Sequence, residues 1–245
     1  MTEELFREDA TLATCAARIT GVDERGVRLN RTVFYPLGGG QAADRGVLVL
    51  ADGSELEIVD TRKGMLPGEI VHVPAPGQQP LLARLAVGQA VDARIDLPLR
   101  RRHMRFHTAT HLLCALVPYP VDGCSITGDY ARLDFHMVEP LDKQLLSAGL
   151  ARLVAEACPV RHSWISEAEL DANPGLVRSM SVQPPRGHGR VRVLEIEGVD
   201  LQPCGGTHVA NTAEVGAVIV TRVEKKAAMT RRVVLGFARP EADAN

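Results

Sequence analysis

Short apolar segments with β-branched residues fill the first third of the chain, and turns containing glycine separate them. Such segments predict strands, and about six short strands at close spacing predict a small β-barrel. The predicted strands are residues 11–20, 26–34, 45–50, 55–61, 69–73 and 90–95.

The pattern changes at Asp96-Leu97-Pro98, because proline favours the first turn of a helix. We predict a long helix over residues 99–117, which Pro118 and Pro120 end. This change of period divides the chain into a barrel domain, residues 1–96, and a second domain, residues 97–245.

The second domain mixes both kinds of element. Residues 130–137 alternate as a strand does, and residues 140–157 read as an amphipathic helix. We expect its inward positions to be Leu141, Leu145, Leu146, Leu150 and Leu153. Further strands are expected at residues 160–165 and 190–197, with a hairpin at 216–224 and 231–237. The predicted class is therefore α+β: a small barrel, then long helices packed on a mostly antiparallel sheet.

Composition is typical of a globular protein. The 245 residues are 45% hydrophobic, and no apolar run approaches the ~20 residues that cross a membrane. The acidic N-terminus is unlike a signal peptide, so we expect a cytoplasmic protein without a membrane partner. The cysteines are odd in number and widely spaced, which argues against a disulfide framework. They are Cys15, Cys114, Cys124, Cys158 and Cys204.

Two short motifs indicate a metal site. His107 and His111 stand at i and i+4, so both imidazoles lie on one face of the predicted helix. Far downstream, Cys204 and His208 would add a thiolate and a third imidazole. This mixed nitrogen and sulfur set suits Zn2+, and we predict one zinc ion per chain. Thr108 replaces the glutamate of the H-E-x-x-H protease motif, which argues against a protease of that kind.

These motifs carry a family resemblance. The sequence from His107 to Leu113, with the Cys204-Gly205-Gly206-Thr207-His208 motif, resembles the editing domain of alanyl-tRNA synthetase. The Phe34 to Gln41 segment, followed by Asp44-Arg45-Gly46, is similar to the glycine-rich signature of the freestanding editing proteins. The chain is identified as a member of the AlaX family, of the medium-length type.

The resemblance implies a deacylase that acts in trans on mischarged alanine tRNA at its acceptor end. A synthetic pocket for alanine discriminates poorly against smaller glycine and against serine, so a second site must inspect the product. Seryl-tRNA is the expected substrate, and glycyl-tRNA is a further one. Nothing in the sequence resembles an ATP-dependent aminoacylation domain, so we expect an ATP-independent reaction.

The resemblance also implies site residues. The glycine-rich loop would place Gly38, Gly39, Gly40 and Gln41 at the editing pocket. The alternative is that this segment is an ordinary loose hairpin loop. Gly205 and Gly206 would bind substrate as well. Thr108 would contact the serine hydroxyl, or simply pack in its helix. The candidate catalytic residues are Gln41, Thr108 and Cys204.

Two basic clusters are candidates for tRNA contacts. The first crowds the start of the long helix, where the helix dipole disfavours positive charge. In the second, the predicted hairpin turn carries Lys225 and Lys226, and Arg231 and Arg232 follow it. Each is either an ordinary solvated or edge-protecting surface or a track for phosphates. The residues are Arg100, Arg101, Arg102, Arg105, Lys225, Lys226, Arg231 and Arg232. Aromatic residues make up only 4%, which gives no support for a platform that stacks single-stranded bases.

Several alternatives stay open from the sequence alone. Zinc with four protein ligands would be structural, whereas catalytic zinc keeps one position open. The chain could instead be a tRNA-binding module with a structural zinc, or a zinc hydrolase of a small ester. The sequence favours a monomer without deciding the oligomeric state.

Overall fold

The computed structural model describes residues 1–178, 180 and 189–238. The chain divides into two compact units, Met1–Gly38 with Ala42–Arg101, and Gly39–Gln41 with Arg102–Asn245. The division between them falls inside the long helix, a few residues beyond the predicted boundary. The three residues Gly39–Gln41 of the glycine-rich loop join the second unit. The assignment of residues 1–96 and 97–245 as domains stays a prediction.

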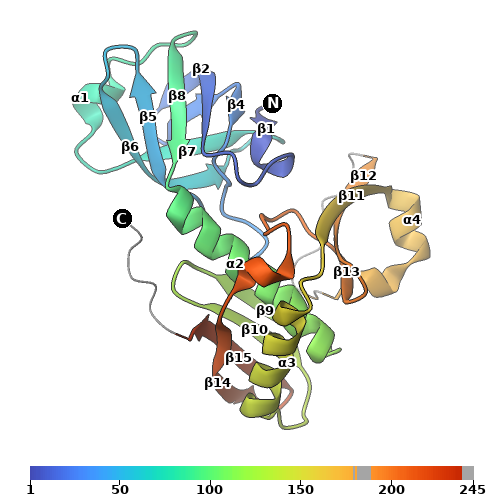
Figure 1. The fold of residues 1–245 in the computed structure, drawn as a ribbon. Helices are drawn as coiled ribbons and strands as arrows, with labels where there is room; N and C mark the ends of the chain where they lie inside the picture. Colours follow the sequence, from blue (N-terminus) through green and yellow to red (C-terminus); the bar gives the residue numbers. More distant parts are fainter. Residues whose placement is uncertain (179, 181–188, 239–245) are drawn as a thin grey trace. The chain divides into compact units, whose positions relative to one another are not determined.

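A closed barrel forms the first unit, with strand order β2-β3-β7-β6-β5-β8 (Figure 1). In β8, exposed and buried residues alternate strictly, so that Val91, Ala93 and Ile95 point into the core. The same alternation sends Leu56 and Ile58 of β6 inward. The strands are β2 (Thr14–Asp23), β3 (Gly26–Leu29), β5 (Gly46–Leu50), β6 (Glu55–Lys63), β7 (Ile70–Pro74) and β8 (Ala90–Ile95).

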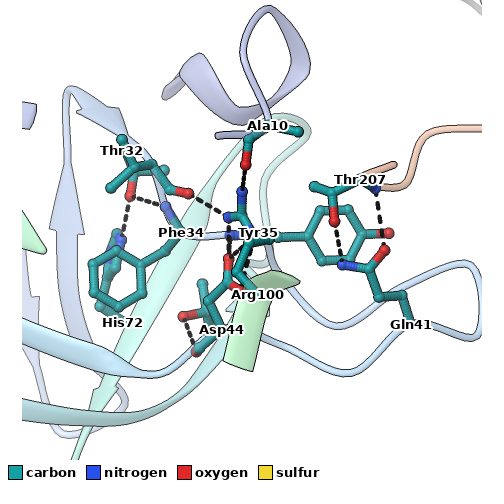
Figure 2. Close-up of polar contacts among 11 residues, drawn as sticks. Ala10, Thr32, Phe34, Tyr35, Gln41, Asp44, His72, Arg100 and Thr207 are labelled. Carbon is teal, nitrogen blue, oxygen red and sulfur yellow. Dashed lines mark hydrogen bonds and ion pairs between the residues drawn. The ribbon is translucent and has the colours of Figure 1, made fainter. Parts of the chain in front are cut away.

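Smaller elements complete this unit. The short strands β1 (Glu3–Glu4) and β4 (Arg31–Thr32) pair in parallel, and α1 (Gln79–Leu82) forms a single turn of helix. The interior also holds a buried ion pair, Asp44 with Arg100, which we call the barrel polar centre. Figure 2 shows the Arg100 guanidinium between the Asp44 carboxylate and the Ala10 carbonyl.

The long helix α2 runs over Leu97–Leu116, close to the predicted range. The Asp96 carboxylate begins it by accepting a hydrogen bond from the Leu99 amide at 3.0 Å. Nearly all side chains between Met104 and Cys114 are buried, the polar ones included. A helix buried on every side is an interior element, so its histidines lie inside the protein.

An antiparallel sheet of order β14-β15-β10-β9 lies in the second unit with helix α3 (Lys143–Ala155) packed on β14 (Figure 1). Leu146, Leu150 and Leu153 face inward as predicted. Leu145 does not, because it lies one position outside that stripe, and it is 72% exposed. The strands are β9 (Val121–Ile126), β10 (Ala131–His136), β14 (Val218–Ala227) and β15 (Thr230–Phe237).

A second antiparallel sheet has the order β11-β12-β13. Strands β11 (Val160–Ser166) and β12 (Arg190–Ile196) match predicted strands, and α4 (Glu167–Ala172) follows β11. Strand β13 (Asp200–Pro203) was not predicted, although it delivers the chain to Cys204. A four-residue strand leaves too short a pattern to detect from sequence.

The predicted α+β class is confirmed by the antiparallel barrel, the antiparallel sheets and the helices beside them. Among the residues that the structure describes, every helix is too short or too polar to cross a membrane.

Candidate metal centre

Helix α2 brings His107 and His111 to one face, because residues four apart lie one turn above each other. Their ring centroids are 5.6 Å apart. Both side chains are almost completely buried. Two adjacent buried imidazoles need partners for their polar nitrogen atoms.

The second half of the site begins where β13 ends. The Cys204 amide donates to the Arg192 carbonyl at 3.0 Å, which continues the pairing of β13 with β12. The Arg192 guanidinium donates to the carbonyls of Cys204 and Gly206 at 2.9 and 3.2 Å. These bonds fix the loop against β12, so His208 enters the site from a rigid support.

The structure brings His107, His111, Cys204 and His208 together, and we call these residues the ligand cluster. One nitrogen or sulfur atom from each lies within 4.8 Å of all the others. The Cys204 sulfur is 3.2 Å from Nε2 of His208 and 3.5 Å from Nε2 of His107. Zinc bond lengths of ~2.0–2.1 Å to nitrogen and ~2.3 Å to sulfur place tetrahedral neighbours about 3.6 Å apart. The cluster therefore has donors and spacing that fit a metal ion.

Each imidazole of the cluster has a hydrogen-bond partner at Nδ1, the ring nitrogen that does not face the other cluster residues. Nδ1 of His107 lies 2.7 Å from Oε1 of Gln41, and Nδ1 of His111 lies 2.8 Å from a carboxylate oxygen of Asp200. Both oxygens only accept, so both Nδ1 atoms carry a proton and both Nε2 atoms are turned toward the metal position. Nδ1 of His208 lies 3.2 Å from the Thr108 hydroxyl, which the same arrangement allows.

Asp200 belongs to a wider polar group that sequence reasoning missed. The Gln202 amide donates to both carboxylate oxygens of Asp200 at 2.9 and 3.0 Å, and Arg178 lies 3.7 Å away. Asp200, Gln202 and Cys204 alternate along the chain, so they share one face of the sheet. That spacing of polar residues just before Cys204 was the signal that could have revealed them.

Burial and mutual charge set the protonation of the cluster. Burial lowers the pKa of His111. The hydrogen bond with Asp200 and the contact with Cys204 have the larger, opposite effect and raise this pKa to about 10. Burial raises the pKa of the Cys204 thiol, but charge on His107 and His208 brings it well below its ordinary value. Burial and the charge on His107 hold the pKa of His208 well below its ordinary value. A Cys204 thiolate is thus favoured beside positive charge on His111, and a bound metal would supply that charge in place of the proton.

Gln41 reaches the cluster because its loop is bound to β9. The Gly40 carbonyl accepts from the Ile126 amide at 2.7 Å. Gly40 has φ +82°, and a Cβ atom there would lie 2.8 Å from the Cys124 sulfur. Gln41 is fully buried, and Figure 2 shows its amide joined to Thr207, at 2.9 Å to the hydroxyl and 3.1 Å to the backbone amide.

The glycines expected at the pocket differ in their surroundings. Gly206 lies against the cluster, and a Cβ atom there would be 2.1 Å from a ring carbon of His107. Gly205 and Gly39 are exposed. Gly38 lies in the first unit, where its carbonyl accepts from the Tyr35 hydroxyl at 2.8 Å. Their contact with substrate stays a prediction.

Two of the predicted tRNA-binding residues are interior side chains, which corrects their assignment. Arg100 is fully buried, because its guanidinium neutralises Asp44 in the barrel polar centre. Arg231 is 8% exposed and donates to the carbonyls of Val138 and Ala227. Both guanidiniums are engaged inside the protein, so we do not propose them as phosphate contacts.

The other basic residues lie at or near the surface. Arg101 and Lys225 are exposed. Arg102 and Arg105 are partly buried and donate to the carbonyls of Gly128 and Val215. Lys226 and Arg232 both pair with the buried carboxylate of Asp134, together with Arg132. The sequence had suggested that Lys225 and Lys226 lie in the hairpin turn. Both lie in strand β14 instead.

Two family models match the chain. Residues 191–234, which include Cys204 and His208, match the threonyl and alanyl tRNA synthetase second additional domain. Residues 7–99 match the class II (A) tRNA synthetases. The alanyl-tRNA editing protein AlaX-M of Methanosarcina barkeri is 35% identical over 242 residues, which cover 95% of this chain and 98% of that protein. This chain belongs to the family of the AlaX-M editing proteins.

Other relatives agree with membership in the AlaX-M family. The AlaX-M protein of Saccharolobus solfataricus is 32% identical over 95% of this chain and 98% of its own length. The alanine-tRNA ligase of Pyrococcus furiosus is 33% identical over 98% of this chain, which spans only 26% of the ligase. The AlaX-M fold thus corresponds to one part of that longer synthetase.

Proposed function

We propose that this protein hydrolyses the ester that joins a wrong amino acid to alanine tRNA. The observation that carries the proposal is the ligand cluster, whose imidazoles are each held at Nδ1 with Nε2 turned to a common point. A family of alanyl-tRNA editing proteins supplies the substrate class. We propose serine as the main amino acid removed and glycine as a further one.

The donor set favours zinc as the metal. Three imidazoles and one thiolate are borderline to soft ligands, which suit Zn2+ and not Mg2+ or Ca2+. Bound there, zinc would either hold the site in shape or act as a Lewis acid on the ester and a water. The chain itself orients the imidazoles, through Gln41 at His107 and Asp200 at His111.

Gln41 and Thr108 act on this reaction through the ligand histidines. Both side chains are fully buried, and both contact an imidazole of the cluster. We therefore propose them as positioning residues. The direct contact of Thr108 with the serine hydroxyl, expected from the resemblance, is the alternative that an experiment must separate.

The variant Thr108→Val makes that separation. If Thr108 only holds His208, serine and glycine release fall together and zinc affinity falls about tenfold, as for loss of an outer partner of a ligand. If Thr108 reads the serine hydroxyl, serine release falls while glycine release and zinc affinity stay. Thr110→Val is the matched control, because among the described residues its buried hydroxyl donates to the His107 carbonyl in the helix and to no cluster side chain.

We propose that cations at or near the surface make the contacts with the tRNA backbone. Lys226, Arg232 and Arg132 surround one carboxylate, Asp134, so the group keeps a net positive charge. We propose this group and Lys225 as phosphate contacts, with Arg101, Arg102 and Arg105 as further ones. Lys225→Glu should raise KM for charged tRNA and reduce its dependence on salt.

The decisive experiment is a time course of amino acid release from alanine tRNA charged with serine, glycine or alanine. We expect rapid loss of serine, slower loss of glycine and retention of alanine. A sample treated with chelator and the variant Cys204→Ala should both lose the activity. Serine that stays bound in the presence of folded, zinc-loaded protein would contradict the proposal.

Two other functions give different results in the same assay. A tRNA-binding module with structural zinc would bind the charged tRNA tightly without release of the amino acid. A hydrolase of small esters would cleave a free aminoacyl ester as fast as charged tRNA, and Lys225→Glu would leave its rate unchanged.

A further inference from the structure

The chain contains one tryptophan, Trp164, and it lies on the edge strand β11 with 38% of its surface exposed. An exposed indole is unusual in a chain with 4% aromatic residues. The guanidinium of Arg190, on the neighbouring strand β12, lies over the ring at 4.6 Å from its centroid. An aromatic ring beside a guanidinium plane is the pair that proteins use to stack unpaired RNA bases.

Strand register places this ring on the same side of the sheet as Cys204, two strands away. Trp164 is the direct partner of Arg192, and the Cys204 amide bonds to the Arg192 carbonyl on the other side. The three residues thus form one row across β11, β12 and the residue that follows β13, and Figure 1 shows these three strands side by side. Direct partners in antiparallel strands point to the same face, so the indole and the Cys204 thiolate share one side of the sheet. Two strand spacings put their Cα atoms about 10 Å apart.

We propose that Trp164 and Arg190 bind an unpaired base at the 3′ end of the tRNA. This inference rests on the proposed function, because the ester to be cleaved is carried by the ribose of that end. The ring is apolar and flat, the guanidinium is positive, and the partner offers flat bases on a negative backbone. Charge, shape and position on the sheet thus match one occupant. The low aromatic content argued against a platform of several rings, but one ring beside the site is enough for one base.

Fluorescence tests the proposal directly, because every photon from tryptophan comes from Trp164. The unmodified protein is titrated with the trinucleotide CCA and with the same ribose-phosphate chain without bases. We expect strong quenching by CCA and little by the chain without bases. Equal quenching by both, or none by either, would overturn the proposal. If this surface binds a protein partner instead, neither CCA nor the chain without bases should quench the fluorescence.

Kinetics with serine-charged tRNA give an independent reading. Trp164→Leu keeps apolar area but loses the aromatic face, and it should raise KM about tenfold, within the range for loss of one stacked base, with kcat little changed. Trp164→Phe should restore most of the affinity. The control Leu201→Ala alters a 42% exposed side chain on the opposite face of the same sheet and should change neither constant.

The two readings also separate this inference from the proposed function. Quenching by CCA without amino acid release would support the base site and defeat the deacylase. Release of serine with the same KM in Trp164→Leu as in the unmodified protein would support the deacylase and defeat the base site.

Discussion

Both units bury polar groups, and the two groups differ in what completes them. In the barrel polar centre, Arg100 donates to the Asp44 carboxylate and to the carbonyls of Ala10 and Val33 at 2.9 and 2.7 Å. The Tyr35 amide donates to Asp44 at 2.6 Å. One positive and one negative charge cancel, so the polypeptide alone satisfies this centre.

The ligand cluster reverses this arrangement. The outer nitrogens of its imidazoles are held by Gln41, Asp200 and Thr108, while the inner nitrogens and the Cys204 sulfur face each other. Atoms that accept converge there, and they need a positive charge between them. The chain completes the barrel polar centre by itself, whereas the ligand cluster has donors that a metal ion could complete.

The largest expected effect comes from breaking the barrel polar centre. Arg100→Met leaves the Asp44 carboxylate buried without its cation and should lower the free energy of unfolding by ~3–5 kcal/mol. Denaturant unfolding of the protein measures the loss. Arg101→Met, at the exposed neighbouring position, should change it by less than ~0.5 kcal/mol.

The double variant Asp44→Leu with Arg100→Met sharpens the result. Because it removes both charges, it should be more stable than Arg100→Met alone. A double variant less stable than the single one would mean that the pair contributes more than mutual neutralisation.

His72 extends the comparison to pH. Its buried ring contacts the Thr32 hydroxyl at 2.8 Å and the Val27 carbonyl at 3.0 Å, and burial lowers its pKa from 6.5 to about 4. Between these values the unfolded chain binds a proton that the folded barrel excludes. Stability should therefore fall as the pH falls from 6.5 to 4, by up to ~3 kcal/mol.

Unfolding measured across this pH range in the unmodified protein and in His72→Gln isolates the effect. The difference between the two should shrink as the pH falls and stay constant above pH 7. His162→Gln, an exposed histidine, is the control. Parallel curves for the unmodified protein and His72→Gln would show that His72 does not titrate as its burial requires.

The contrast also explains what the sequence could predict. The barrel strands and α2 were predictable, because turn residues and apolar segments are local signals. The cluster members were predictable too, because His107 with His111, and Cys204 with His208, are each four residues apart. Close sequence spacing carried these parts of the fold and of the site.

The rest depends on contacts between distant residues. Arg100 sits in a basic run that resembles a surface, and its partner Asp44 lies 56 residues away. Gln41 is 66 residues from His107, and Asp200 is 89 residues from His111. No local sequence pattern indicates such pairs. For this reason too many cations were assigned to tRNA binding and Asp200 was missed.

A substitution at Gly206 tests how tightly the ligand cluster is packed. Gly206→Ala places a Cβ atom 2.1 Å from a ring carbon of His107 and 3.0 Å from Oε1 of Gln41, so the ring must leave its partner. We expect zinc affinity, measured by competition with a chelator, to fall about 100-fold, the upper end for loss of an outer partner. Gly175→Ala is the matched control, because a Cβ atom there meets nothing within 4 Å. Unchanged zinc affinity in Gly206→Ala would show that the loop can move without disturbing His107.

The smallest effect should come from Asp200→Asn, which keeps an oxygen near Nδ1 of His111 but removes the negative charge that polarises the imidazole. Zinc affinity should fall about tenfold, the lower end for such partners, and global stability should change little. Asp122→Asn is the control, because Asp122 pairs with His136 at 3.2 Å in the same unit but outside the cluster. Equal losses of zinc affinity in both variants would mean that the cluster responds to general charge and not to the held imidazole. A loss confined to Asp200→Asn would show that the chain tunes metal binding through the hydrogen bond at Nδ1 of His111. The barrel polar centre offers no such control, because its own two charges already neutralise each other.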